Sequence, residues 1–70
     1  MVGLALVDLG ADDGLYPGDF LTVFRKRNDS GTVRTLLGEA AVLWTKGKTC
    51  VAKITSMVDS MQAGDFVELK

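Results

Sequence analysis

Four aspartates near the start of the chain form the densest group of side chains that could bind a metal ion: Asp8, Asp12, Asp13 and Asp19. Carboxylate oxygens are the ligands that Ca²⁺ prefers. Their spacing does not match the D-x-[DN]-x-[DN]-G calcium loop, and no glutamate follows at the required distance. Turn formation accounts for all four, because aspartate side chains accept hydrogen bonds from nearby backbone N–H groups. We therefore expect no metal site.

The groups needed for nucleophilic or acid–base catalysis are largely missing from the sequence. The chain contains no histidine, which removes Ser-His and Cys-His catalysis and histidine-ligated zinc. Cys50, the single cysteine, lies in an apolar alternation that is typical of a buried structural thiol. Gly47-Lys48-Thr49 matches the end of a phosphate-binding loop, but Val42 replaces the required glycine and a strand is expected to follow. We expect no catalytic residues, no cofactor and no enzymatic activity.

A short basic run, Arg25-Lys26-Arg27, could form a small anion-binding patch together with Arg34. The alternative is solvated charge beside a hairpin. Asp29 lies two residues after the run, and a simple meander brings Asp59 and Asp65 to the same end of the sheet, which cancels most of the positive field. The net charge of −1 and the pI of about 5.1 argue against nucleic acid as the main partner and give no general attraction to anionic lipid.

A Gly-Asp step occurs twice, and each copy leads into an alternating apolar segment. Gly18-Asp19 precedes residues 20–23, and Gly64-Asp65 precedes residues 66–69. Glycine adopts positive φ without a Cβ clash, and an aspartate carboxylate can fix a turn by accepting backbone N–H groups. We expect Asp19 and Asp65 to cap two structurally equivalent turns. This repeat indicates a curled sheet and gives no sign of a catalytic centre.

The alternation of apolar residues predicts an all-β fold, a small five- to six-stranded barrel-like antiparallel sheet. Gly38 lies within the longest extended segment, where it predicts a bulge or bend. A short helical turn is expected at residues 57–62, and the terminal strands are expected to pair or cross and so close the sheet. The predicted strands are residues 2–9, 20–27, 33–46, 49–55 and 66–70, joined by a loop at 10–18, a hairpin turn at 28–31 and a tight turn at 46–48.

The alternation also divides the apolar residues between two faces. Leu15 is expected to turn inward from its loop and plug the core. A surplus apolar set on the second face is a candidate partner surface; alternatively, these side chains pack under the loop at 10–17 or the turn at 56–63. This set is Phe20, Phe24, Val42 and Trp44. The predicted core is Leu4, Leu6, Leu9, Leu15, Leu21, Val23, Leu37, Ala41, Leu43, Ala52, Ile54, Val67 and Leu69.

The length of 70 residues allows one domain, residues 1–70, with a small core and marginal stability. A single cysteine cannot form an intrachain disulfide. No run approaches the ~20 apolar residues of a membrane helix, and the first residues lack the basic charge of a signal peptide. We expect the domain to be excised from a longer protein and not to insert directly into a membrane.

A set of turn and core motifs covers nearly the whole chain. They are Val7-Asp8-Leu9-Gly10, Asp13-Gly14-Leu15, Pro17-Gly18-Asp19, Phe24-Arg25, Leu37-Gly38-Glu39-Ala40, Ala52-Lys53-Ile54 and Gly64-Asp65-Phe66-Val67. In these the chain resembles the C-terminal domain of flagellar assembly protein T and related β modules that accompany LysM domains in bacterial envelope proteins. The resemblance implies a non-enzymatic scaffolding role in the periplasm or cell envelope. It also implies that a strand preceding Val2 in that family is missing here.

Three functions follow as hypotheses. The first is an interaction module that binds a protein partner, a neighbouring domain or a second copy of the chain. The second is a nucleic-acid-binding barrel, because the chain has a more distant likeness to Gly-Asp-box barrels such as swapped-hairpin transcription factors; the acidic pI counts against it. The third is a weak peptidoglycan or carbohydrate binder that uses Trp44 and Tyr16 as stacking platforms.

Overall fold

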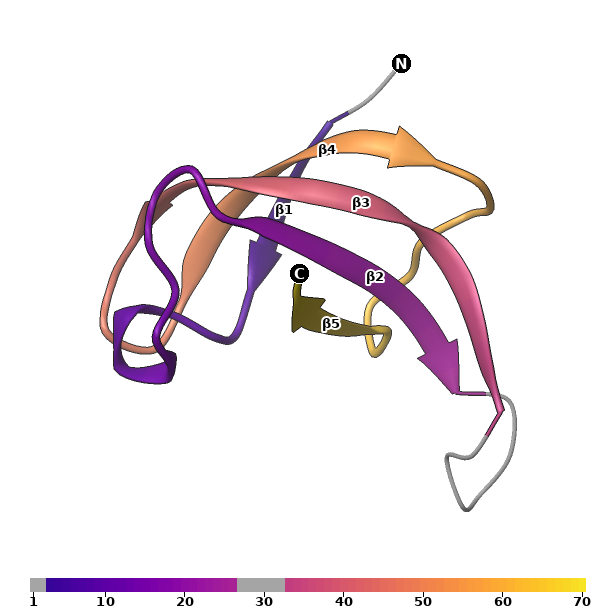
Figure 1. Ribbon diagram of the computed structural model, residues 1–70, viewed down its shortest axis with the longest axis horizontal. Helices are drawn as coiled ribbons and strands as arrows, with labels where there is room; N and C mark the ends of the chain where they lie inside the picture. The colour runs from indigo at the N-terminus through magenta and orange to yellow at the C-terminus, as the bar shows by residue number, and fades with distance from the viewer. Residues whose placement is uncertain (1–2, 27–32) are drawn as a thin grey trace.

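Five strands form one antiparallel sheet that curls into a half-barrel (Figure 1). The structure, a computed structural model, describes residues 3–26 and 33–70. The predicted all-β, barrel-like fold class is confirmed. The elements are β1 (Leu4–Val7), the 3₁₀ turn η1 (Ala11–Asp13), β2 (Phe20–Lys26), β3 (Arg34–Thr45), β4 (Cys50–Met57) and β5 (Phe66–Leu69).

The strand order is β1-β4-β3-β2-β5. The predicted meander of β2, β3 and β4 is confirmed, although the predicted hairpin turn at 28–31 lies outside the described residues. The prediction that the terminal strands close the sheet is wrong. Within residues 3–26 and 33–70, β1 pairs only with β4 and β5 only with β2. In a five-stranded sheet with antiparallel neighbours, the two outer strands run in the same direction, so they cannot extend the antiparallel pattern by joining each other.

The long strand β3 bends around Gly38, as predicted. Its pairing with β2 skips Leu37, and its pairing with β4 skips Thr55, so bulges interrupt both ladders next to this glycine. A Cβ on Gly38 would lie 2.1 Å from the Ser56 carbonyl oxygen. The backbone approach at the bend therefore requires glycine.

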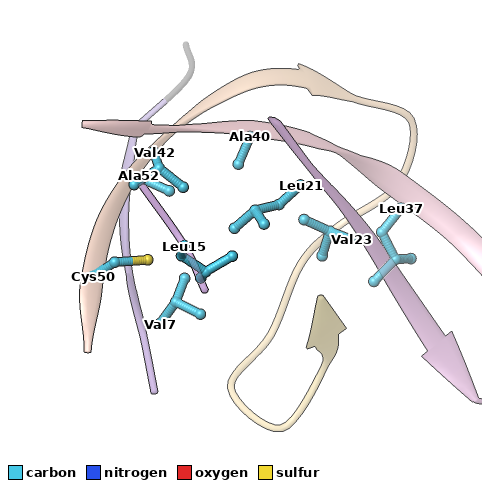
Figure 2. Packing of buried hydrophobic residues seen from close by; sticks show 9 residues of the cluster. All are labelled: Val7, Leu15, Leu21, Val23, Leu37, Ala40, Val42, Cys50 and Ala52. Atoms are coloured by element: carbon cyan, nitrogen blue, oxygen red, sulfur yellow. The ribbon is translucent and has the colours of Figure 1, made fainter. Parts of the chain in front are cut away.

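The core fills the concave side of the sheet (Figure 2). Leu15 is 2% exposed and plugs one end, as predicted. Five predicted core residues are wrong: Leu4, Leu6, Ala41, Leu43 and Leu69. Ala41 is half-buried and the other four are exposed. The buried cluster comprises Val7, Leu15, Leu21, Val23, Leu37, Ala40, Val42, Cys50 and Ala52.

Two physical effects explain four of these errors. The fifth, Leu69, lies opposite buried Leu21 but is exposed because, among the described residues, edge strand β5 has a neighbour only on its β2 side. Edge strand β1 is buried on one face only, so Val7 points inward and its neighbour Leu6 points outward. In β3 the bulge at Gly38 reverses the alternation: Leu37 points inward before it, and Ala40 and Val42 point inward after it. A prediction that carries one alternation through the whole of β3 places Ala41 and Leu43 inside instead.

The predicted helical turn at 57–62 is also wrong. β4 continues to Met57, and the backbone N–H groups of Val58 and Asp59 then both donate to the Leu37 carbonyl oxygen. This attachment to β3 replaces the local hydrogen bonds that a helix would need. The short helical turn lies instead at η1, within the first loop.

Candidate functional site

The two Gly-Asp turns have the same geometry. Gly18 and Gly64 have φ values of 94° and 97°, which L side chains rarely adopt. The carboxylate of Asp19 accepts a hydrogen bond from the Tyr16 N–H at 2.9 Å, and that of Asp65 accepts one from the Gln62 N–H at 2.7 Å. Each carboxylate therefore accepts a hydrogen bond from the N–H of the residue three positions earlier. The backbone N–H of the same aspartate donates to the carbonyl oxygen of that earlier residue and closes the turn.

These turns lead into β2 and β5, which pair with each other. Leu21 lies opposite Leu69 and Val23 lies opposite Val67, so the two copies form a ladder around Thr22 with approximate two-fold symmetry. The repeated sequence thus produces one symmetric strand pair. Its role is to position two strands.

The second turn carries an ion pair that, among the described residues, the first does not form. The guanidinium of Arg25 donates to both carboxylate oxygens of Asp65, at 2.9 and 3.1 Å, and to the Ser60 carbonyl oxygen at 3.1 Å. The hydrogen bond from Arg25, with a second from the Gln62 N–H, holds the pKa of Asp65 below its usual value. The same bond raises the pKa of Arg25. The sequence placed these residues at one end of the sheet but did not show that they pair.

The other described members of the basic group are also engaged. Arg34 pairs with Glu68 and lies over the ring of Phe24, while Lys26 lies over the ring of Phe66. The two rings stack with centroids 5.8 Å apart. Arg27 lies outside the described residues. The described cations thus cover an aromatic pair and compensate acidic neighbours, which leaves little for an anion-binding patch.

An apolar surface occupies the convex side of the sheet, where β1, β4 and β3 lie side by side. Leu6 lies opposite Val51, and Val51 lies opposite Trp44, so these residues form a row across three strands. The bulge between Val42 and Trp44 leaves Leu43 exposed beside that row. We call Leu6, Leu43, Trp44 and Val51 the outer face.

The predicted partner surface is only partly present on this convex side. Phe20 and Trp44 are about half exposed, at 53% and 49%. Phe20 lies opposite Ala41 at the β2 side of the outer face. Phe24 is covered by Phe66 and Arg34, and Val42 lies in the core. The prediction that places Val42 on the partner surface is therefore wrong. Its cause is the reversed alternation of β3, which also explains the errors at Ala41 and Leu43.

The concave side contains an open trough of about 810 Å³ between β1 and β5. Val7 and Leu9 line it from the β1 side, Val67 from the β5 side, and Val23 and Ile54 from deeper in the sheet. Figure 2 shows the labelled core side chains on the concave side of the sheet, three of which, Val7, Val23 and Ala40, also line the trough. The trough is thus an extension of the core.

Two of the four aspartates near the start of the chain, Asp13 and Asp19, have carboxylates that accept backbone hydrogen bonds. Asp13 accepts a hydrogen bond from the Gly10 N–H at 2.9 Å, and the Ala11 and Asp12 N–H groups donate to carbonyl oxygens of the turn at 46–47. This contact places the acidic loop against the turn that carries Lys46. In the part of the chain that the structure describes, no three histidine, cysteine or acidic residues are grouped as metal ligands.

The remaining candidate motifs also have structural positions. Cys50 is fully buried in the core, and burial raises the pKa of its thiol. Gly47 and Lys48 form the turn between β3 and β4, which the Lys46 N–H closes by donating to the Thr49 carbonyl oxygen. Neither arrangement presents a nucleophile or a phosphate cradle to solvent.

No protein-family model, curated protein or solved structure matches the chain. Among the described residues, no helix has the length and apolar character needed to cross a membrane. The family resemblance drawn from the turn and core motifs stays a hypothesis.

Proposed function

We propose that this domain is a non-enzymatic interaction module that docks a protein partner or neighbouring domain on its outer face. The observation that carries the proposal is the row formed by exposed Leu6, half-buried Val51 and exposed Trp44, joined by exposed Leu43. A contiguous apolar patch on a small domain favours burial against another surface, because such patches are uncommon on free monomers. The small core adds to this argument, since a partner would bury further apolar area.

We further propose a scaffolding role in a bacterial cell envelope or periplasm, as in flagellar assembly. The support is the resemblance to the C-terminal domain of flagellar assembly protein T. The resemblance rests on turn and core residues such as Pro17-Gly18-Asp19 and Gly64-Asp65.

Site-specific photo-crosslinking tests the docking face. A photoreactive residue at Trp44 or Leu43 should form an adduct with one defined protein, whereas the same residue at Lys48, in the β3–β4 turn, should not. Leu6→Ser should weaken the adduct formed from Leu43, because it removes apolar area at the far end of the row. Equal adducts at Lys48 and Trp44, or none at either, would count against the proposal.

Two further assays separate the other hypotheses. A gel shift with mixed DNA should show no binding, whereas a salt-sensitive shift would favour the nucleic-acid alternative. Trp44 fluorescence should stay constant on titration with peptidoglycan fragments. A saturable change would favour carbohydrate stacking on Trp44 and Tyr16, both of which are exposed.

A further inference from the structure

The two edges of the half-barrel run in the same direction. Each neighbouring pair in the order β1-β4-β3-β2-β5 is antiparallel, so β1 and β5 are parallel to each other. A single additional strand between them could therefore be antiparallel to both edges. Six strands close an antiparallel barrel in a way that five do not, because an even number makes every neighbouring pair antiparallel.

The backbone groups needed for this pairing point out of the sheet. The Ile54 N–H donates to the Gly3 carbonyl oxygen, so Gly3 faces β4 and, by alternation, Leu4 and Leu6 direct their N–H and C=O groups away from it. The Lys70 N–H donates to the Phe20 carbonyl oxygen. By the same alternation, Val67 and Leu69 direct theirs away from β2.

The space between the edges suits the side chains of a strand. The trough is lined by inward-facing apolar residues of both edges, Val7 and Val67, and by Ile54 and Met61. Leu69, opposite the fully buried Leu21, is still 50% exposed, as expected for a core position that lacks one neighbour. A strand here would cover the trough with alternate apolar side chains and present the others to solvent.

We propose that the opening between β1 and β5, the seam, binds an extended segment of another polypeptide as a sixth strand. The five strands of the described chain are already paired in this sheet, so none is free to fill the opening. A small apolar ligand would fill the trough but leave the outward N–H groups of both edges unpaired. A strand satisfies both edges, which is the basis of peptide recognition by strand addition. The seam is a different surface from the outer face and does not depend on the function proposed for that face.

Selection from a displayed library of random peptides, about eight residues long, tests the proposal without assuming a partner. Selected peptides should alternate apolar with polar residues. The bound synthetic peptide should slow amide hydrogen exchange at Leu4, Leu6, Val67 and Leu69 by at least about tenfold, since each of these N–H groups would gain a hydrogen bond. The same peptide with alternate amides N-methylated should not bind, because it cannot pair on one of its edges.

A matched pair of variants locates the binding site. Leu6→Pro removes one outward N–H donor from an edge position where proline is tolerated, and it should weaken peptide binding by about tenfold or more. Leu6→Ala keeps that donor and should bind the peptide about tenfold or more tightly than Leu6→Pro does. Leu6→Ala also removes apolar area from the outer face, so it should reduce the yield of the photo-crosslinked adduct. The two binding surfaces are thereby tested separately.

Four outcomes would overturn the proposal. They are the absence of any selected peptide, unaltered exchange at the four edge amides, equal binding by the N-methylated peptide, and a chain that sediments as a dimer with these amides already protected. The last result would assign the seam to a second copy of the chain. The N-methylated peptide keeps the test decisive if Leu6→Pro fails to fold.

Discussion

The two Gly-Asp turns provide an internal control for the contribution of an ion pair to stability. Asp19 and Asp65 each accept one backbone hydrogen bond from a residue three positions earlier, and only Asp65 also binds Arg25. Asp19→Ala removes a single bond to an exposed N–H group that water can replace. We expect this variant to lose about 0.5–1.5 kcal/mol of unfolding free energy. For a domain of about 60–100 residues this corresponds to a fall in Tm of roughly 2–12 °C.

Asp65→Ala should be the more destabilising substitution. It removes the bond to the Gln62 N–H together with both bonds to the Arg25 guanidinium, and the Asp65 side chain is only 10% exposed. Asp65→Asn should fall between the two alanine variants, because its amide oxygen can still accept the Gln62 N–H. Thermal and urea denaturation followed by circular dichroism measure all three.

A second background isolates the ion pair. In an Arg25→Met chain, which retains the apolar stem, Asp65→Ala and Asp19→Ala should become similar in cost, because the local turn bond is then all that either loses. Added salt should also reduce the difference, since the Arg25 side chain is 39% exposed. If Asp65→Ala costs no more than Asp19→Ala in the unchanged chain, the reasoning is refuted.

Three further predictions concern acid stability, backbone contact and thiol burial. The pKa of Asp65 in the folded chain lies below its unfolded value of about 3.9. The contribution of the Asp65 carboxylate to the free energy of unfolding is therefore complete above that pH and is lost as the pH falls through the folded pKa. Urea midpoints should accordingly decline less steeply with acid for Asp65→Asn than for the unchanged chain. Gly10→Ala should cost about 1–3 kcal/mol or more, because its Cβ would lie 2.2 Å from the Lys46 carbonyl oxygen, whereas Gly3→Ala, which meets nothing within 4 Å, should leave the urea midpoint unchanged. Cys50 should react with a thiol reagent at alkaline pH only at the rate of unfolding, and fast reaction of the folded chain would contradict its burial.

Local rules were sufficient for the two Gly-Asp turns and for the central meander of β2, β3 and β4. The glycine of each Gly-Asp step and the alternation that follows it are properties of adjacent residues, so the sequence alone predicts two turns leading into two strands. The meander follows from the short connections of β3 to its neighbours. The Arg25–Asp65 pair is different, because the two residues lie 40 positions apart and meet only through the pairing of β2 with β5.

The composition of the apolar surfaces depends on bulges, which the sequence announces only in part. Gly38 predicts a bend, but the reversal of alternation that it causes is a property of two ladders at once, one to β2 and one to β4. That reversal places Val42 in the core, and a second bulge returns Trp44 to the outer face beside Leu43. An uninterrupted alternation would place Val42 and Trp44 on the same face of β3, so it cannot predict that one is in the core and the other on the outer face.

The open seam has a similar origin in topology. The expectation that the terminal strands would close the sheet treats an unpaired edge as a liability to be removed. The strand directions show why joining β1 to β5 does not remove the unpaired edges in the antiparallel pattern of the sheet, because the two strands run in parallel. The N–H and C=O groups of two residues in each strand are directed into the opening. The exposed Leu69 and the half-buried Val67 lie opposite buried residues of β2, and an additional strand beside β5 would cover them. An antiparallel strand is the addition that pairs both edges and covers both side chains, which is why the seam and the trough are best explained together.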